Sequence, residues 1–411
     1  MDTYAPPEMA NEVKALTGEM YLQYSGVSFK DLVERPLRIA RDFTISYVGK
    51  YAFVGCKDLE VVDFPNCRSV DKYAFAGCKN LKEVRLPICK QIEELAFKDC
   101  TGLRSITFER ACKFSAIGDS VDTFRGCENL ETLNIINVTS VPTWYLNGTS
   151  PCFKYYNFPD TKVIGAAAFR NIKTPLAVSF PECSSIGTAA FWSCTYLSEV
   201  VFPKCESIGS SAFVSCSGLI SVVFPKCKDI GYAAFRLCSS LRDISFPFCV
   251  SINFEAFSQC SNLISASFPA CKYIQQWAFC YCASLSMISF PACLRIGDSA
   301  FMHCSAISVA SFPACSRIDI GAFYDCTSLS VANFPACEKI GNHAFSGCVN
   351  LEKVYLLSTS ICALGVGAFA STPIETYGSV FVPTSLYSLY LVDGTWSSIA
   401  DRIVPYTEGA D

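Results

Sequence analysis

Histidine and charge are both scarce in this chain. Only 2 of its 411 residues are histidine, and Asp, Glu, Lys and Arg together make up 17%. Two histidines leave little room for the acid–base and metal chemistry that most often uses this side chain. The net charge of −4 gives no basic surface for nucleic acid, and no apolar run approaches the roughly 18 residues of a membrane helix. We therefore expect neither nucleic-acid binding nor membrane insertion.

The sequence signatures of common enzymes and cofactor sites are also missing. The chain has no G-x-G-x-x-G, phosphate-loop, H-E-x-x-H or G-x-S-x-G motif in a suitable context. Its carboxylates are scattered without a recurring pair, and His303 and His343 occupy different positions of the repeat described below, which favours solvated surface side chains. We expect no catalytic residue, no cofactor and no metal ligand, and therefore no enzyme.

The start of the chain lacks the features of a leader. Residues Met1 to Pro7 contain neither the basic segment nor the apolar segment of a signal peptide. The protein could stay inside a cell, have lost a leader, or leave the cell by another route. The first residues alone thus leave localisation open.

Cysteine, by contrast, is abundant, with 26 residues. Many cysteines are typical of secreted proteins held together by disulfides, but those usually have fewer than about 100 residues and cannot build a large core. A chain of 411 residues that is 51% apolar can build one. The cysteines need another explanation, which their spacing supplies.

An internal repeat of 22 residues organises most of the chain. Alignment on a phenylalanine that usually follows alanine gives a constant step of 22 from Phe169 to Phe345. The anchors are Phe53, Phe75, Phe97, Phe124, Phe169, Phe191, Phe213, Phe235, Phe257, Phe279, Phe301, Phe323, Phe345 and Phe369, with Leu146 in the phenylalanine place of one irregular repeat. Self-similarity at this period predicts a solenoid, here of about fifteen repeats.

The repeat from Phe191 to Ala212 shows the local structure that we expect. Residues 197–202 follow the spacing L-x-x-V-x-F, whose alternation predicts a short strand. Pro203 ends the strand because proline cannot donate to a ladder. Residues 210–213 predict a short helical or 3₁₀ turn on the other side. One such unit cannot bury its apolar face alone, so neighbouring units must stack.

This pattern resembles a known family. The segment L-x-x-[VI]-x-F-P-x-C is similar to the leucine-rich repeat consensus, and the surrounding I-G-x-x-A-F-x-x-C-x-x-L resembles the BspA-like class over roughly residues 45–385. The resemblance implies a right-handed α/β solenoid with a parallel sheet on the concave face and short helical or 3₁₀ turns on the other. It further implies non-catalytic adhesion to a protein or carbohydrate ligand at a cell surface.

Two alternatives to a cell-surface adhesin stay open. A chain without a leader also fits a phage virion protein, either receptor-binding or tail-associated, because virions leave by lysis. The cysteine spacing is similar to the cysteine-containing repeats of intracellular adaptors. The expected localisation is thus extracellular by resemblance, with virion or cytoplasm open, and self-association is a further option.

Nearly all cysteines fall into two columns of the repeat. The first column lies three residues after the anchors and contains Cys56, Cys78, Cys100, Cys127, Cys194, Cys216, Cys238, Cys260, Cys282, Cys304, Cys326 and Cys348. The second lies after the strand and contains Cys67, Cys89, Cys112, Cys183, Cys205, Cys227, Cys249, Cys271, Cys293, Cys315, Cys337 and Cys362. Cys152 and Cys280 lie outside both columns.

Three interpretations of these columns compete. The favoured one is buried free thiols that fill the core and donate weakly to turn carbonyls. Disulfides between stacked neighbours fit the strand spacing, but identical stacked side chains point in parallel rather than toward each other. Metal binding is disfavoured because ligand sets need closer spacing, such as C-x₂-C.

Residues between the core positions of each strand should form columns on the concave face. From Ser245 to Val331 these columns are small, flat and nearly uncharged, which fits either a smooth surface for a partner or duplicated repeats that merely tolerate stacking. The charged candidates for binding on this face are Glu83, Arg85, Arg104, Glu199 and Asp243.

The irregular repeat, residues 125–168, has lost both cysteine positions. It contains four large aromatic residues, Trp144, Tyr145, Tyr155 and Tyr156, in a chain with only 4 tryptophans. Exposed rings could stack on a sugar or anchor a protein. Alternatively, the rings repack the core where the column is interrupted.

The chain ends differ from the repeats. We expect an N-terminal cap over residues 1–44, with a helix near Glu8–Leu16, followed by the solenoid over residues 45–376. Residues 377–411 should form a C-terminal cap with a strand at Ser379–Pro383 and a closing helix from Leu386 to Ile403. Such caps cover the end cores of a solenoid.

Overall fold

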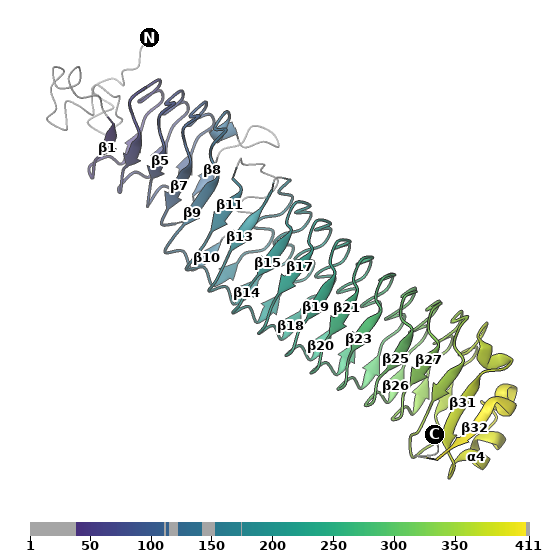
Figure 1. The fold of residues 1–411 in the computed structure, drawn as a ribbon. Coiled ribbons are helices and arrows are strands. Elements are labelled where there is room, and N and C mark those ends of the chain that lie inside the picture. The colour runs from purple at the N-terminus through teal and green to yellow at the C-terminus, as the bar shows by residue number, and fades with distance from the viewer. Residues whose placement is uncertain (1–37, 111, 115–121, 142–152, 174, 408–411) are drawn as a thin grey trace, which may run out of the picture. The chain divides into compact units, whose positions relative to one another are not determined.

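The computed structural model describes residues 38–110, 112–114, 122–141, 153–173 and 175–407. They divide into two compact units, residues 1–183 (unit 1) and 184–411 (unit 2). Each unit is a stack of repeats, and each repeat contributes one strand to a main parallel ladder and a two-residue strand to a short parallel ladder (Figure 1). This arrangement is the parallel-sheet solenoid that the repeat predicts.

In unit 1 the main ladder is a seven-stranded sheet. Its strands are β1 (Ile39–Arg41), β3 (Val61–Asp63), β5 (Glu83–Arg85), β7 (Ser105–Phe108), β9 (Thr132–Ile135), β11 (Tyr155–Asn157) and β13 (Ala177–Ser179). The short strands are β2 (Tyr47–Val48), β4 (Ser69–Val70), β6 (Gln91–Ile92), β8 (Lys113–Phe114), β10 (Ser140–Val141) and β12 (Val163–Ile164), and η1 (Asp122–Phe124) is a 3₁₀ turn. Ala40 pairs with Val62, so the ladder already includes a strand within the segment that was expected to be a cap.

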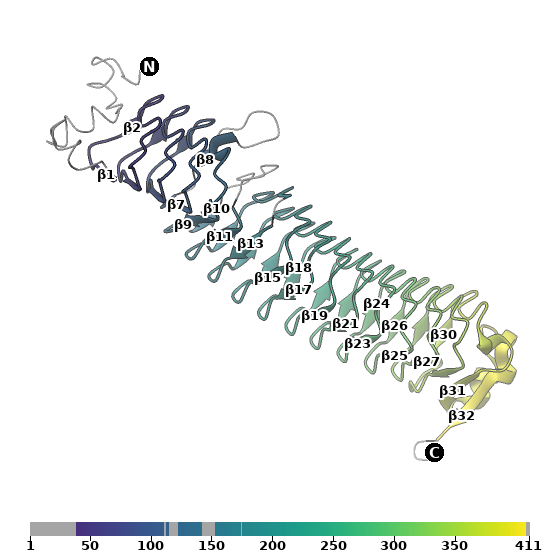
Figure 2. The ribbon, with the colours of Figure 1, turned by 45° about the horizontal axis from the view of Figure 1, so that its top comes forward.

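In unit 2 the main ladder consists of two five-stranded sheets. The first has the strands β15 (Glu199–Val201), β17 (Ser221–Val223), β19 (Asp243–Ser245), β21 (Ser265–Ser267) and β23 (Met287–Ser289). The second has β25 (Val309–Ser311), β27 (Val331–Asn333), β29 (Lys353–Tyr355), β31 (Ser379–Pro383) and β32 (Ile403–Tyr406). The short ladder has β14 (Ser185–Ile186), β16 (Ser207–Ile208), β18 (Asp229–Ile230), β20 (Ser251–Ile252), β22 (Tyr273–Ile274), β24 (Arg295–Ile296), β26 (Arg317–Ile318), β28 (Lys339–Ile340) and β30 (Ala363–Leu364). Figure 2 shows these short strands running beside the main ones. Neighbouring repeats align without slippage, as the pairing of Val200 with Val222 illustrates.

The core consists of columns in which equivalent side chains stack. The anchor rings lie nearly parallel, with centroids 5.1 Å apart and an interplanar angle of 3° for Phe213 and Phe235. Both rings are fully buried, as are Leu219 and Cys216 of the same repeat. Burial of one large apolar side chain stabilises a fold by about 1.5–3 kcal/mol, so the repetition of these columns explains why each repeat needs its neighbours.

The chain around each anchor is held by two alternating sets of hydrogen bonds. The N–H groups of Ser211, Phe213 and Ser215 donate to carbonyls of the following repeat at 2.7–2.9 Å. The intervening N–H groups of Ala212 and Val214 donate to carbonyls three residues earlier. This alternation places Ser211 and Ser215 in the left-handed region, with φ of 57° and 59°. The expected helical or 3₁₀ turn is therefore a run of four-residue turns that also binds the next repeat.

The cysteine columns have two distinct hydrogen-bonding roles. In the first column the thiol of Cys238 donates to the carbonyl of Phe213 in the preceding repeat at 3.1 Å. In the second column the thiol of Cys227 donates to the carbonyl of Asp229 in its own repeat at 3.4 Å. All described cysteines are free, and all except Cys56 are buried. The interpretation as buried free thiols is confirmed for these residues, whereas Cys152 lies outside the described part of the chain.

The C-terminal segment closes the last core, but not with one helix. Instead of a helix from Leu386 to Ile403, the structure has α4 (Tyr387–Val392), the 3₁₀ segment η3 (Ser397–Arg402) and then β32. The helix ends because the Asp393 carboxylate accepts the N–H of Thr395 at 2.9 Å, which fixes a turn. The expected strand at Ser379–Pro383 is present as β31, preceded by the 3₁₀ turn η2 (Pro373–Glu375).

Two aromatic side chains of this segment bind the final repeat. The hydroxyl of Tyr390 accepts the N–H of Cys362 at 2.8 Å, and the indole N–H of Trp396 donates to the carbonyl of Cys362 at 2.8 Å. Both rings are fully buried. None of the helices in the described residues has the length and apolarity that a membrane crossing requires. The expected helix at Glu8–Leu16 lies outside the described residues.

Candidate functional site

The outer face of the main ladder is a regular surface in each unit. Along each main strand the middle residue is usually buried and its neighbours face outward, as the exposed–buried–exposed pattern of β5 and β15 shows. Successive repeats therefore line up equivalent side chains in rows along the ladder. What each unit places in these rows decides what the face can bind.

In unit 1 one row is a chain of ion pairs. The Arg41 Nε atom lies 2.8 Å from the Asp63 carboxylate in the next repeat. Arg85 lies on the other side of Asp63 at 4.0 Å and also pairs with Glu109 at 2.7 Å. Asp63 is only 6% exposed. These charges therefore stabilise one another across repeats, and a ligand would compete with pairs that already exist.

A second row of unit 1 repeats this arrangement at the surface. The Glu60 carboxylate lies between Arg38 and Lys82, with the Lys82 ammonium at 2.7 Å. The hydrogen bonds from Lys82 and Arg38 lower the pKa of Glu60. Lys154 and Glu131 form a similar pair at 2.7 Å. Opposite charges one repeat apart, such as Glu60 and Lys82, are the sequence signal for these pairs.

The charged candidates named from sequence all lie on these outer faces. Glu83, Arg85 and Arg104 are exposed in unit 1, and Glu199 and Asp243 are exposed in unit 2. Arg85 lies next to Asp63, which was not among the candidates. Glu83 and Arg104 lie in two other rows of the face. The five residues therefore do not converge on one pocket.

The aromatic candidates of the irregular repeat separate into three groups. Trp144 and Tyr145 lie outside the described residues. Tyr155, at the start of β11, is 53% exposed, but Tyr156 is 1% exposed and packs edge-on against Phe153 and Phe169 at 5.8 and 6.1 Å. Tyr156 is thus a core residue and is not available to a ligand, because the middle position of the strand points inward.

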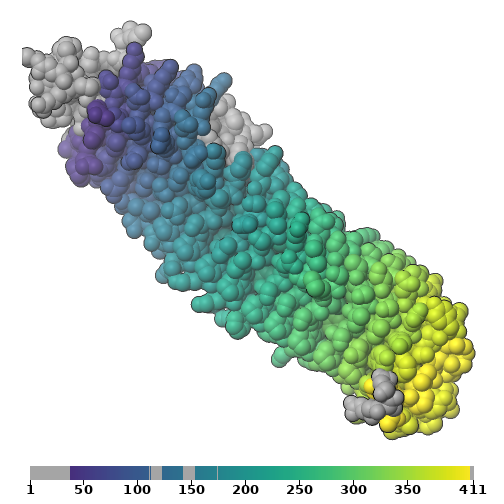
Figure 3. All heavy atoms as spheres, viewed as in Figure 1, coloured from purple at the N-terminus to yellow at the C-terminus, as the bar shows by residue number. Residues whose placement is uncertain are grey.

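The outer face of unit 2 carries Glu199 and Asp243 at one end, but its strand residues from Ser245 to Val331 are uncharged and mostly serine, valine or methionine. Val201, Val223, Met287 and Val309 are 46–58% exposed. Small serines surround Met287 and Val309, and together they line a shallow hollow of about 410 Å³. The described surface of unit 2 that faces the viewer in Figure 3 is even, with narrow grooves between repeats.

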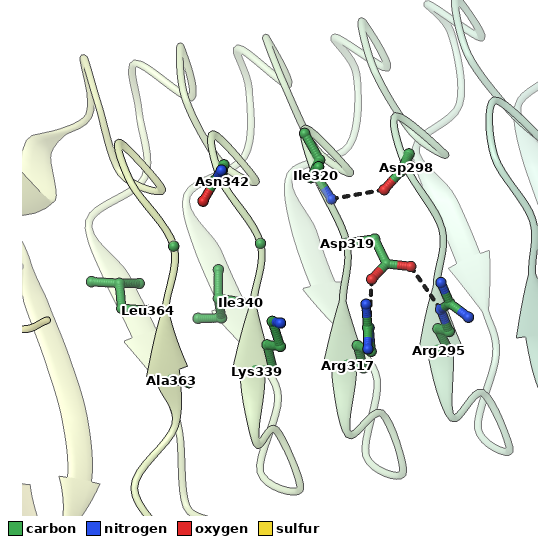
Figure 4. Close-up of a pocket in the computed structure, with 12 residues that line it drawn as sticks. Arg295, Asp298, Arg317, Asp319, Ile320, Lys339, Ile340, Asn342, Ala363 and Leu364 are labelled. Atoms are coloured by element: carbon green, nitrogen blue, oxygen red, sulfur yellow. Dashed lines mark hydrogen bonds and ion pairs between the residues drawn. The ribbon is translucent and has the colours of Figure 1, made fainter.

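A second hollow, of about 520 Å³, lies beside the short strands β24, β26, β28 and β30 (Figure 4). Asp319 lies between two arginines and accepts the Nε–H of Arg295 at 2.7 Å and that of Arg317 at 2.6 Å. Adjacent repeats have Gly297 and Gly341 at the position of Asp319. One carboxylate oxygen binds Arg317 of the same repeat and the other binds Arg295 of the preceding repeat, so we assign this cluster to joining these two repeats.

Both histidines lie in the turns around the anchors. Among the residues that the structure describes, no group of three or more His, Cys, Asp or Glu side chains could hold a metal ion. His303 is partly buried beside Asp325 at 3.5 Å rather than fully solvated as expected. His343 lies against Gly367, where an added Cβ would meet its ring at 2.7 Å.

The repeats themselves match a family model. The model of the BspA type leucine rich repeat region matches residues 46–176, 162–285 and 250–376, and so covers more than half of the chain. The chain belongs to the BspA-type leucine-rich repeat family. Proteins of this solenoid class are generally non-catalytic and bind proteins or other ligands. No curated protein matches this BspA-type chain.

Several solved structures are similar to this BspA-type protein. A leucine-rich repeat protein from Bacteroides ovatus is 23% identical, with a TM-score of 0.42, and the match covers 76% of this chain and 82% of that one. A leucine-rich cell surface protein from Faecalibacterium prausnitzii is 22% identical, with a TM-score of 0.32 and coverage of 75% and 82%. At these low scores the family assignment rests on the repeat match and not on these structures.

Proposed function

We propose that this protein is a non-catalytic binding protein that presents the outer face of the unit 2 main ladder to a protein or glycan partner at a cell surface. The observation that carries the proposal is two pairs of exposed apolar side chains on this face, one on β15 and β17 and one on β23 and β25. Val201, Val223, Met287 and Val309 are about half exposed although the chain has an ample core. Exposed apolar patches on soluble proteins mark interaction sites more often than chance would give.

The contrast with the charged rows of unit 1 supports the choice of face. A ligand on unit 1 must displace ion pairs such as Arg41–Asp63, whereas a ligand on unit 2 covers valine, methionine and serine side chains. Desolvation of a charged pair is costly, but burial of apolar surface is favourable at about 25 cal/mol per Å². The fixed backbone ladder also limits the entropy that binding would cost.

The proposal is tested with two double variants of the full chain on an array of surface proteins, matrix proteins and glycans. Met287→Glu with Val309→Glu places two charges on the proposed face. Val250→Glu with Tyr273→Glu makes the same charge change at positions that are 46% and 43% exposed on the short-ladder side. We expect the first variant to lose binding at least tenfold to any arrayed partner of the wild type, and the control to stay within twofold. Equal losses in both variants would contradict the proposal.

A further inference from the structure

A third hollow of unit 2, of about 610 Å³, lies on the side of the turns around the anchors. We call it the turn hollow and define it by Tyr281, His303, Tyr324, Asp325 and Gly347. It does not include any residue of the main-ladder face discussed above. Its chemistry is unlike that of the other two hollows, because it combines aromatic rings, one carboxylate and several hydroxyl groups.

The backbone holds the members of this hollow rigidly. Tyr281, His303, Asp325 and Gly347 occupy the same place in consecutive repeats, two residues after the anchor, and all have positive φ, from 55° to 78°. Each of their N–H groups donates to a carbonyl of the next repeat at 2.8–2.9 Å. The side chains therefore project from a hydrogen-bonded ladder and need little ordering when a ligand arrives.

Aromatic rings form one wall of the turn hollow. The rings of Tyr281 and His303 stack with centroids 4.6 Å apart and an interplanar angle of 24°. Tyr324 meets His303 edge-on at 6.0 Å. Tyr281 remains 50% exposed although it stacks on His303. An exposed ring edge and hydroxyl of this kind combine apolar contact area with a polar group.

The carboxylate of Asp325 is positioned beside this wall. Its Oδ2 atom lies 3.5 Å from His303 Nδ1, and the side chain is 35% exposed. Gly347 makes room for it, because an added Cβ at Gly347 would lie 1.9 Å from Asp325 Oδ1. Gly347 also has a φ of 78°, which disfavours other residues. A longer side chain in the next repeat would thus close the hollow and displace the carboxylate.

The rest of the lining is uncharged. It includes the hydroxyl-bearing residues Ser305, Thr327 and Ser346 and the side chain of Val349, which is 55% exposed. No lysine or arginine lines the hollow among the described residues, so an anion has no counter-charge there. A single carboxylate without a second acidic side chain is also a poor cation site.

From this combination we propose that the turn hollow binds a neutral sugar residue. Sugars have apolar C–H faces, which pack against aromatic rings, and adjacent hydroxyl groups, which donate to a carboxylate. The Asp325 carboxylate can accept two such hydroxyls, and the Ser and Thr hydroxyls can serve as donors or acceptors. The shallow shape suits a terminal or branching unit of a glycan rather than an enclosed small molecule. This site is separate from the main-ladder face, so either proposal can fail alone.

The test uses the full chain with a neutral glycan array and with methyl glycosides of glucose, galactose, mannose and N-acetylglucosamine in saturation-transfer NMR. Asp325→Asn keeps the size of the side chain and suits a positive φ, so folding should be preserved. We expect Asp325→Asn and Tyr281→Ala each to weaken the response to the best neutral glycan at least tenfold. Met287→Glu with Val309→Glu should leave that response unchanged, which separates this site from the main-ladder face.

The matched control is Asp99→Asn in unit 1. Asp99 occupies the same repeat position with a φ of 56°, and Gly126 follows it just as Gly347 follows Asp325. This variant should bind the neutral glycan like the wild type. The proposal is overturned if the wild type binds none of the arrayed neutral glycans or methyl glycosides, or if Asp325→Asn binds as well as Asp99→Asn.

Discussion

The main-ladder faces of the two units differ far more than their cores do. Unit 1 connects its repeats with ion pairs such as Arg41–Asp63, whereas the same row of unit 2 contains exposed residues such as Val201 and Val223. Below these faces, both units stack phenylalanine anchors at a similar distance, 5.1 Å for Phe75–Phe97 and 5.2 Å for Phe235–Phe257. The buried columns specify the solenoid, and the outer rows are free to differ.

The regularity of the core also differs between the units. In unit 2 the interplanar angle between neighbouring anchors such as Phe301 and Phe323 stays at 9° or less before the last repeat. In unit 1 the angle rises to 17° between the anchors Phe97 and Phe124, and in the irregular repeat Phe153, which takes the place of the strand leucine, meets Phe124 edge-on at 70°. The irregular repeat has leucine in the anchor place, and the rings of Phe153, Tyr156 and Phe169 meet edge-on in its core. Packing thus tolerates irregular repeat length when aromatic residues can reorient.

The largest predicted effect is unfolding at high pH, which tests whether the buried cysteines of the two units respond alike. Burial raises the pKa of Cys249, Cys260 and Cys271 to about 12 each in unit 2, and burial also raises the pKa of Cys112 in unit 1. Unfolded thiols lose their protons near pH 8.5, so the unfolded state gains stability as the pH rises from there toward 12. We expect full stability below pH 8.5 and cooperative unfolding of both units near pH 10–11.

Residue-resolved alkylation of the thiols measures this transition. All four cysteines should resist iodoacetamide at pH 8 in the native protein and react at that pH in urea. Above the transition they should become modified together with the loss of far-ultraviolet circular dichroism. Modification of the unit 2 cysteines in the native protein at pH 8 would show that the thiols are accessible, contrary to the buried columns.

The next largest effect is the loss of stability when one anchor phenylalanine is replaced in either unit. Phe97 in unit 1 and Phe257 in unit 2 are both fully buried between two stacked rings. Replacement by alanine should lower the free energy of unfolding by about 3–5 kcal/mol in either unit because it leaves a cavity. The exposed residues Phe43 and Phe248 provide controls, with changes within about 0.5 kcal/mol. Urea unfolding measures these changes. If the free energy of unfolding fell by less than about 1 kcal/mol at one of the two anchors, the two cores would not be equivalent.

The similarity of the cores is also what made most of the fold predictable. Every anchor from Phe169 to Phe345 is buried as the repeat requires, because a constant spacing of 22 residues leaves one stacking register. The two-residue strands of the short ladder, such as Ser207–Ile208, are too short to show a periodicity. The positive φ of Ser211 has no signal in serine itself, since hydrogen bonds to the next repeat impose it.

The candidate sites were less predictable than the fold. The inward position of Tyr156 follows from the strand alternation, but the irregular repeat hides which residue is central. The break at Asp393 has a local signal, the sequence Asp-Gly-Thr, although the apolar residues on both sides favoured one helix. The turn hollow depends on Tyr281, His303 and Asp325, which lie one repeat apart and become neighbours only after stacking.

A smaller effect should distinguish the outer rows of the two units. Asp63 is 6% exposed between Arg41 and Arg85, so Asp63→Asn should cost about 1–3 kcal/mol because it removes the negative charge that both arginines face. Asp243 is exposed in unit 2, and Asp243→Asn should cost less than about 0.5 kcal/mol. Urea unfolding at low and high salt measures both changes, and equal costs would show that the unit 1 pairs add nothing to stability.

The smallest effect tests whether the exposed valines of unit 2 stabilise the fold or are instead available to bind a ligand. Val201 and Val223 lie opposite each other in β15 and β17 and are 52% and 46% exposed. Valine favours strands, but the whole propensity scale spans only about 1 kcal/mol. Replacement of each valine by threonine keeps the β-branched shape, so the free energy of unfolding should change by less than about 0.5 kcal/mol per site. A loss above about 2 kcal/mol in urea unfolding would mean that these side chains stabilise the ladder, and the face would then need no partner to explain its apolar character.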